Sequence, residues 1–130
     1  MKEAIPELRK TNGRVVFVSS GAAAFAMPAW GAYGTSKAAV NHLNAHVAAE
    51  EPSITSVAIS PGKVDTDMQK QIREEGKAGM TAESHATFVN EHESGKLLPA
   101  DLPGTVIAKL VDNAPKSFSG KHFRYVHTIL

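Results

Sequence analysis

The sequence contains no cysteine, which excludes disulfide bridges, thiolate metal sites and a cysteine nucleophile. Aromatic residues make up only 6% of the chain, and Trp30 is the single tryptophan. No apolar run reaches the ~20 residues that a membrane-spanning helix needs, because Pro28 interrupts the most apolar stretch, 21–30. An excess of one charge sign is also lacking, since the formal net charge is +1. We therefore expect neither a membrane span nor the basic stripe of a nucleic-acid-binding protein.

What remains is the composition of an ordinary globular domain, with 42% hydrophobic and 21% charged residues among 130. A chain of this length suffices for about one domain. The N-terminal residues mix both charge signs and lack an apolar segment, which argues against a secretory signal. We therefore expect one cytoplasmic domain over residues 1–130.

The hydrophobic pattern predicts alternating strands and helices. Two short runs rich in β-branched residues, 14–19 and 54–60, are typical of buried parallel strands. Between them an Ala-rich segment, 31–50, predicts a long helix that ends before Pro52. The other expected elements are a helix at 2–10, a loop at 20–30, short polar helices at 66–75 and 82–92, an amphipathic helix at 102–111 capped by Asp101, and a strand at 121–126. This alternation indicates an open parallel α/β sheet.

Tyr33 and Lys37 lie four residues apart on the expected long helix, so their side chains share one face. An ammonium group beside a phenol stabilises the phenolate, and a phenol so assisted exchanges protons nearer neutral pH. The pair alone is a weak signal, because many helices contain this spacing by chance and carry it on their surface.

Two further segments are expected at the same edge of the sheet. Ser20 precedes Tyr33 by 13 positions and directly follows the first strand, and Pro61 and Gly62 follow the second. Open α/β sheets form their sites at the carboxyl ends of parallel strands. A hydroxyl at position 20 is therefore placed to donate a hydrogen bond to a substrate carbonyl beside Tyr33.

Taken together, these segments resemble the short-chain dehydrogenase/reductase family. VVFVSS, YGTSK and AISPGKVDT match its pattern from about residue 13 to residue 66. The resemblance implies that Tyr33 is the catalytic acid or base, that Ser20 polarises the carbonyl and that Lys37 holds the nicotinamide ribose. It implies a cofactor, NADP or NAD, that supplies the hydride. The residues implied to contact this cofactor are Tyr33, Lys37, Pro61, Gly62, Val64 and Thr66.

The tail LVDNAPKSFSGKHFRYV is similar to fungal members near the sepiapterin- and benzil-reductase-like branch, which slightly favours NADP. The implied partner is a small carbonyl or alcohol substrate. In the family the helix corresponding to 31–50 commonly forms a dimer interface, so a homodimer is expected by resemblance. Its small residues suit close helix approach, although ordinary core packing explains them equally well; they are Ala38, Ala45, Ala48 and Ala49.

The resemblance also defines what this sequence lacks. The family opens with a glycine-rich turn for the cofactor pyrophosphate, which needs two glycines separated by one residue, and no two of the ten glycines here are so spaced. The family's upstream asparagine and the residue that selects NAD or NADP are also missing. We therefore expect the C-terminal half of a Rossmann-type doubly wound sheet, without the N-terminal βαβ part and with an unpaired strand at its edge.

Two functions remain open at this point. One is a dehydrogenase/reductase that uses Ser20, Tyr33 and Lys37, and the other is a truncated, non-catalytic remnant that serves as a dimerisation or interaction module. A serine hydrolase is disfavoured, because Val18 and Ala22 replace the glycines of a Gly-x-Ser-x-Gly elbow.

No metal site is expected either. His42 and His46 share a helix face, but neither an H-E-x-x-H motif nor a third ligand accompanies them. His85 and His92 are expected at the surface.

The segment at about 64–98 corresponds to the family's variable substrate loop, and its glycines at 76, 79 and 95 predict that it is mobile. Its apolar residues either form a lid over a substrate or pack the short helices onto the sheet; they are Met68, Ile72, Met80, Phe88 and Val89. Trp30 either lines the pocket or packs against the loop before the long helix.

Overall fold

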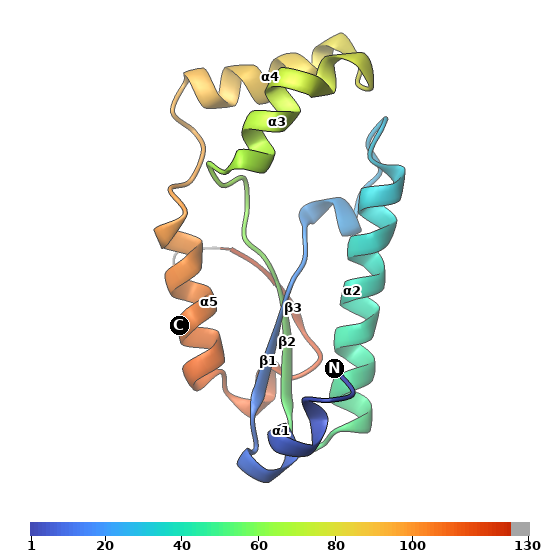
Figure 1. Cartoon of the computed structure of the whole chain (residues 1–130), viewed down its shortest axis with the longest axis vertical. Coiled ribbons are helices and arrows are strands. Elements are labelled where there is room, and N and C mark those ends of the chain that lie inside the picture. The colour runs from blue at the N-terminus through green and yellow to red at the C-terminus, as the bar shows by residue number, and fades with distance from the viewer. Residues whose placement is uncertain (126–130) are drawn as a thin grey trace.

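A computed structural model describes residues 1–125; the last residue of the expected third strand, Val126, lies outside them. The elements alternate as predicted for an α/β protein (Figure 1). In chain order they are α1 (Ile5–Thr11), β1 (Arg14–Val18), η1 (Gly21–Ala23), α2 (Gly31–Glu50), β2 (Thr55–Ser60), α3 (Asp67–Glu75), η2 (Gly76–Ala78), α4 (Ala82–Glu93), α5 (Asp101–Asn113), η3 (Lys116–Phe118) and β3 (His122–Arg124).

The three strands form one parallel sheet in the order β1-β2-β3. All six residues of the central strand β2 are buried, as its continuous apolar pattern predicts. β1 pairs with β2 on one side and with no described strand on the other, and Val18 at its end is 47% exposed. The expected unpaired edge is therefore confirmed for the described residues.

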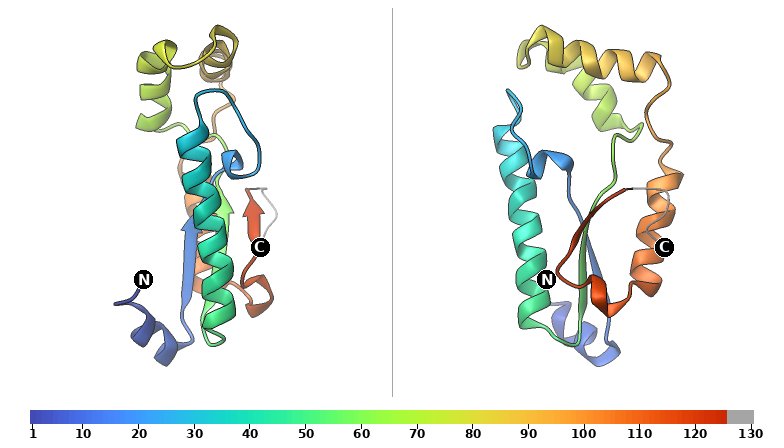
Figure 2. Two further views of the ribbon diagram at one scale, coloured as in Figure 1. Left: turned by 90° about the vertical axis from the view of Figure 1, so that its right-hand side faces the viewer. Right: turned by 180° about the vertical axis from the view of Figure 1, so that it is seen from behind.

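Helices cover both faces of the sheet, which confirms the doubly wound arrangement (Figures 1 and 2). Val57 and Ile59 of β2 pack with Leu110 of α5 in a fully buried cluster. On the opposite face α2 is fixed by a polar contact, because the buried Ser56 hydroxyl donates to Asn44 Oδ1 at 2.8 Å. Asn44 Nδ2 donates in turn to the Lys121 carbonyl at 3.1 Å, so α2 is tied to both β2 and the start of β3.

Two helix starts differ from the sequence-based expectation. The predicted capping role of Asp101 is wrong: Ala100 occupies the N-cap position without a side-chain hydrogen bond, and Asp101 is the first helical residue. Its carboxylate there still suits the positive end of the helix dipole. The first helix begins at Ile5 and not at residue 2, since Pro6 is favoured in a first turn. Within residues 1–125, no helix is both long and apolar enough to span a bilayer.

The second part of the molecule, residues 64–98 with helices α3 and α4, is called the α3–α4 lobe below. It lies beyond the carboxyl ends of the strands (Figure 1). A Cβ at Gly76 would lie 3.5 Å from Met80 and 3.6 Å from Ile72, so both side chains pack inside the lobe. His85 Nε2 contacts the Arg73 carbonyl oxygen at 2.8 Å and joins α4 to α3. Of the two alternatives that the sequence left open for these apolar residues, a lid or packing onto the sheet, neither describes Ile72 and Met80, which pack between the helices of the lobe.

Two chain segments connect the lobe to the rest of the molecule, one coming from β2 and one leading to α5, and they run side by side. Val64 and Leu98 form a parallel bridge. The Asp65 N–H donates to the Leu98 carbonyl at 2.8 Å, and the Leu98 N–H donates to the Lys63 carbonyl at 2.9 Å. The loop after β2 is thus held at a defined position above the sheet.

Candidate active site

Ser20 lies where β1 opens into the loop before α2. Its backbone is extended, and its Oγ accepts a hydrogen bond from the Ala22 N–H at 3.2 Å, which caps the η1 turn. No acceptor within residues 1–125 takes the proton of its own hydroxyl. The backbone therefore orients this oxygen while its O–H stays available to a ligand.

Tyr33 and Lys37 lie one turn apart on α2, as predicted from their spacing. Lys37 Nζ donates to the Val18 carbonyl at 3.0 Å and lies 5.7 Å from the centroid of the Tyr33 ring. The ammonium is thus held between the end of β1 and the phenol. The Tyr33 hydroxyl makes no hydrogen bond to any residue that the structure describes.

Gly34 sets how closely α2 approaches the η1 turn. A Cβ at this position would lie 2.8 Å from the Ala22 carbonyl oxygen, closer than real Cβ contacts allow. The sequence-based reasoning missed this residue. Its signal is a glycine inside a helix, which costs about 1 kcal/mol relative to alanine and so indicates a packing reason.

Two contacts hold the turn that carries Ser20 against the helix that carries Tyr33 and Lys37. Lys37 is bonded to Val18, two positions before Ser20, and Gly34 lies against Ala22, two positions after it. The structure in this way brings the turn that carries Ser20 onto the helix that carries Tyr33 and Lys37.

The other residues predicted to contact the cofactor lie in one loop at the carboxyl end of β2; they are Pro61, Gly62, Val64 and Thr66. This end adjoins the end of β1, because Ile59 pairs with Val18. Gly62 has φ +84°, a left-handed conformation that favours glycine. Thr66 Oγ1 donates to the Val64 carbonyl at 3.3 Å, immediately before α3. Pro61, half-buried, follows β2 directly.

At the end of β2, Ser60 Oγ and His122 Nε2 lie 2.7 Å apart and link the last residue of β2 to the first residue of β3. Burial lowers the pKa of His122 below its ordinary 6.5, and the positive charge of Arg124 lowers it further. The neutral imidazole is therefore the form that this part of the sheet favours.

Trp30, for which the sequence left two alternatives, packs between α2 and the α3–α4 lobe. Its ring meets the Tyr33 ring edge-on, with centroids 5.2 Å apart and planes at 80°. It stacks on Phe88 of α4, with centroids 5.6 Å apart and planes at 14°. Phe88 is only 7% exposed. No sequence pattern signals this contact, because the two residues are far apart in the chain and on different elements.

The remaining candidates lie outside this arrangement. His42 and His46 lie with their Nε2 atoms 3.1 Å apart, and no group of three metal-binding side chains exists among residues 1–125. His92 is exposed, 4.0 Å from Asp65.

A hollow of about 350 Å³ lies between the loop before α2 and the first turns of α2, and Ser20, Tyr33 and Lys37 do not line it.

Of the small residues on α2, Ala38, Ala45 and Ala49 are exposed. Ala48 is half-buried, and a Cβ at Gly120 would lie 3.3 Å from its Cβ. Ordinary packing therefore accounts for Ala48 and leaves the other three on the surface.

The fold and this arrangement of strand-end loops define a Rossmann-type α/β protein. The chain belongs to the short-chain dehydrogenase family, whose model, described as short chain dehydrogenase, matches residues 1–77.

Among curated proteins, an uncharacterized oxidoreductase of Saccharomyces cerevisiae is 47% identical over 124 residues, which are 94% of this chain and 49% of the relative. Its crystal structure, described as a short chain dehydrogenases/reductase, superimposes with a TM-score of 0.91, and the match covers 94% of this chain and 49% of that one.

A benzil reductase ((S)-benzoin forming) of the same yeast is 45% identical over 117 residues, which are 87% of this chain and 44% of the relative. A yeast structure described as a cytoplasmic protein with unknown function is 45% identical, with a TM-score of 0.70, and the match covers 94% of this chain and 48% of that one. The chain thus spans about half the length of the relatives it matches.

Proposed function

We propose that this chain is the catalytic half of an NAD(P)-dependent carbonyl reductase or alcohol dehydrogenase, with Ser20, Tyr33 and Lys37 as its chemical groups. The observation that carries the proposal is the pair of contacts that join β1 and its turn to α2, Lys37 to Val18 and Gly34 against Ala22. Family membership supports it, and the relatives named as oxidoreductases do not favour the non-catalytic alternative.

The three side chains suit proton transfer to a carbonyl oxygen. Tyr33 donates its phenolic proton to this oxygen during reduction and takes it back in the reverse reaction. Ser20, whose O–H is available, donates a second hydrogen bond to the same oxygen and stabilises the charge that develops there. Lys37 stabilises the phenolate that remains after transfer, since its ammonium lies 5.7 Å from the ring centroid.

The nicotinamide cofactor, when bound, supplies the hydride. The chain offers residues for its nicotinamide end, because the loop after β2 adjoins the end of β1. We assign this role to Tyr33, Lys37, Pro61, Gly62, Val64 and Thr66. The glycine spacing needed for the pyrophosphate does not occur in this sequence, so another segment must hold that end. Likeness to a benzil reductase leads us to favour NADP over NAD.

The substrate in this proposal is a small carbonyl compound or alcohol, as the name of the benzil reductase relative suggests. Residues 64–98 act as a mobile substrate loop over the site.

We place the protein in the cytoplasm, in line with the related yeast structure described as cytoplasmic. A homodimer would form through α2, whose exposed face carries Ala38, Ala45 and Ala49.

The test is ketone-dependent oxidation of NADPH and NADH by the chain mixed with the N-terminal half of its yeast oxidoreductase relative. We expect consumption of cofactor only when a ketone is present, and a large loss on Lys37→Met. The matched control is Lys70→Met, an exposed lysine of α3. A discrete complex of the two halves that consumes no cofactor with any ketone would reject the proposal.

A further inference from the structure

His42 and His46 lie on the outer face of α2, away from the sheet. The helix buries only Asn44 and Val47, whereas both histidines are exposed. In the left view of Figure 2, α2 lies in front of the sheet, and no other described helix or strand covers its outer face. The two imidazoles are therefore open to solvent and to small ions, and the proposed proton transfer makes no use of them.

The two rings are already arranged as a pair of ligands. Their Nε2 atoms lie 3.1 Å apart, with the ring planes at 75°. Metal–nitrogen bonds to imidazole measure about 2.0–2.1 Å, so two nitrogens on one ion lie roughly 2.9 Å apart at a right angle and roughly 3.3 Å apart at the tetrahedral angle. The separation on α2 falls between these two values, so one ion can contact both nitrogens with the backbone left in place.

Glu50 favours the tautomer of His46 that binds a metal. Its Oε1 lies 3.5 Å from His46 Nδ1, one helical turn further along α2. A carboxylate beside this nitrogen favours the proton on Nδ1, which leaves a lone pair on the Nε2 atom that faces His42. Carboxylates in this outer position also make a metal-binding imidazole more basic. The next turn of the helix thus supports the pair of ligands.

The helix holds the two histidines at this spacing because it is anchored on its other face. Asn44 Oδ1 accepts a hydrogen bond from Ser56 Oγ at 2.8 Å, and Asn44 Nδ2 donates to the Lys121 carbonyl at 3.1 Å. Ordering a flexible chain is a large cost when a metal site forms. Here the backbone is ordered before the ion arrives, so this cost is small.

We propose that His42 and His46 bind one divalent first-row transition-metal ion through their Nε2 atoms. Imidazole suits Zn²⁺, Ni²⁺ and Cu²⁺, whereas Mg²⁺ requires oxygen ligands. No group of three metal-binding side chains exists among residues 1–125, so water completes the coordination and the ion exchanges readily. The ion clips together two successive turns of the helix that carries Tyr33 and Lys37. The site does not depend on whether the chain reduces a ketone.

The test is a titration of the full 130-residue chain, without an added histidine tag, with Cu²⁺, Ni²⁺, Zn²⁺ and Mg²⁺. Isothermal titration calorimetry gives the affinity and the stoichiometry. We expect one equivalent of ion per chain, tighter binding of Cu²⁺ than of Ni²⁺ or Zn²⁺, and no saturable binding of Mg²⁺. Paramagnetic Cu²⁺ should broaden the NMR signals of amides around residues 42–46 before those of any other segment.

His42→Gln and His46→Gln should each weaken Cu²⁺ affinity by on the order of tenfold or more, because the second nitrogen no longer binds within the same helix. Glu50→Gln should weaken it by a smaller factor, up to about tenfold. The matched control is His92→Gln, which should leave the affinity unchanged. His92 is also exposed and near a carboxylate, with Asp65 at 4.0 Å, but it belongs to no histidine pair in the described part of the chain. Circular dichroism checks that all four variants fold.

Several results would overturn the proposal. They are absence of saturable Cu²⁺ and Zn²⁺ binding, unchanged affinity in both His42→Gln and His46→Gln, and Cu²⁺ broadening that begins outside α2. Half an equivalent of ion per chain, with a dimer in analytical ultracentrifugation, would also overturn it, because the ion would then be shared between two chains. Metal binding that depends on both histidines, in a protein that reduces no ketone, would keep this site and reject only the reductase.

Discussion

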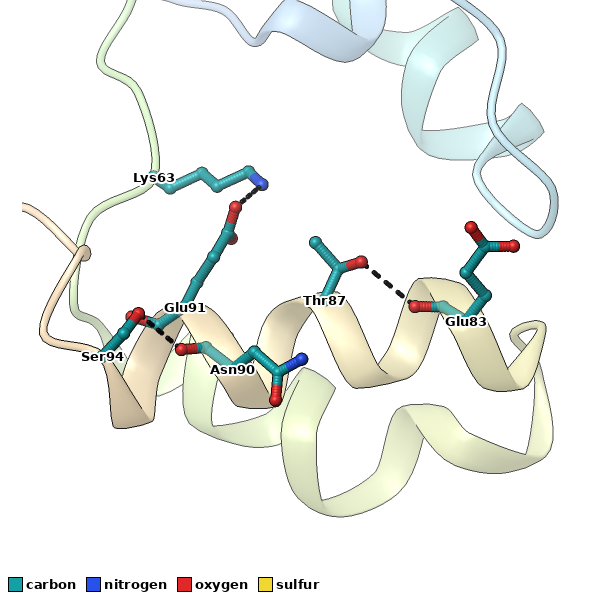
Figure 3. A network of polar contacts seen from close by, with 6 residues as sticks. All are labelled: Lys63, Glu83, Thr87, Asn90, Glu91 and Ser94. Atoms are coloured by element: carbon teal, nitrogen blue, oxygen red, sulfur yellow. Dashed lines mark hydrogen bonds and ion pairs between the residues drawn. The ribbon is translucent and has the colours of Figure 1, made fainter.

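The sheet with α2 and α5 differs from the α3–α4 lobe in what holds it together. β2 buries all six of its residues, and Leu110 of α5 is fully buried against it. In the lobe α3 buries none of its residues and α4 buries only Phe88. The lobe is instead attached by the Val64–Leu98 bridge, the Lys63–Glu91 pair (Figure 3) and the Trp30–Phe88 stack. The three groups proposed for proton transfer, Ser20, Tyr33 and Lys37, thus lie on the well-packed part of the molecule, beside a lobe that is loosely attached.

This difference has a physical consequence for function. Proton transfer needs donors held at fixed positions, which a packed sheet and a long helix provide. A lobe attached by a few polar and aromatic contacts can open and close without unfolding the rest. Mobility of residues 64–98, predicted from their glycines, fits this division of roles and can be measured.

The largest effect is expected in native-state hydrogen exchange. Amides of α4 should exchange by local opening, faster than those of β2 by on the order of a hundredfold or more, because β2 exposes its N–H groups only on global unfolding. Phe88→Leu should accelerate exchange in α4 and leave β2 unchanged. Equal protection of α4 and β2 across a range of denaturant concentrations would show that the molecule opens as one unit, and the comparison would fail.

An intermediate effect is expected at the contact between α2 and the turn that carries Ser20. Gly34→Ala should lower the free energy of unfolding by about 1–3 kcal/mol, because its Cβ meets the Ala22 backbone oxygen and the turn must shift. The matched control is Gly31→Ala, whose Cβ has no neighbour within 4 Å. This substitution should leave the free energy of unfolding unchanged or raise it by up to about 1 kcal/mol. Urea denaturation of both variants measures the difference, and equal stabilities would contradict the close approach.

The smallest effect concerns pH and the end of the sheet. Burial and Arg124 lower the pKa of His122 in the folded state below the ordinary 6.5, so the unfolded chain binds the proton more readily. The contribution of His122 to stability is therefore constant above pH 6.5 and falls as pH drops below it. Urea midpoints of unaltered protein and His122→Gln, compared across this range, should converge at low pH. A gap that instead widens as pH falls would reverse the sign and reject the burial argument.

Local patterns predicted much of the fold, because strands and helices here follow residue type closely. The apolar runs of β1 and β2, the Ala-rich α2 and the edge position of β1 are confirmed. The start of α5 was wrong by one residue, since Asp101 can stabilise a helix from the first turn as well as from the cap.

The candidate site was predictable only where motifs carry it. The helical spacing of Tyr33 and Lys37 and the position of Ser20 at a strand end follow from sequence, and the structure brings these elements together. The stack of Trp30 on Phe88 joins elements distant in sequence, and its position depends on how the lobe docks. Pairwise contacts of this kind leave no periodic signal. Sequence alone therefore left Trp30 between lining a pocket and packing against the loop, and did not anticipate its stack on Phe88.

The most direct test of the account is the turnover of Tyr33→Phe, measured as ketone-dependent NADPH oxidation in the reconstituted protein. Removing the phenolic hydroxyl leaves the ring contact with Trp30 in place, so fold and substrate affinity should persist. We predict a loss in kcat of about 100-fold or more, the usual contribution of a general acid. Turnover within a few-fold of the unaltered protein would contradict the assignment of Tyr33 as proton donor, and with it the claim that α2 carries the chemistry.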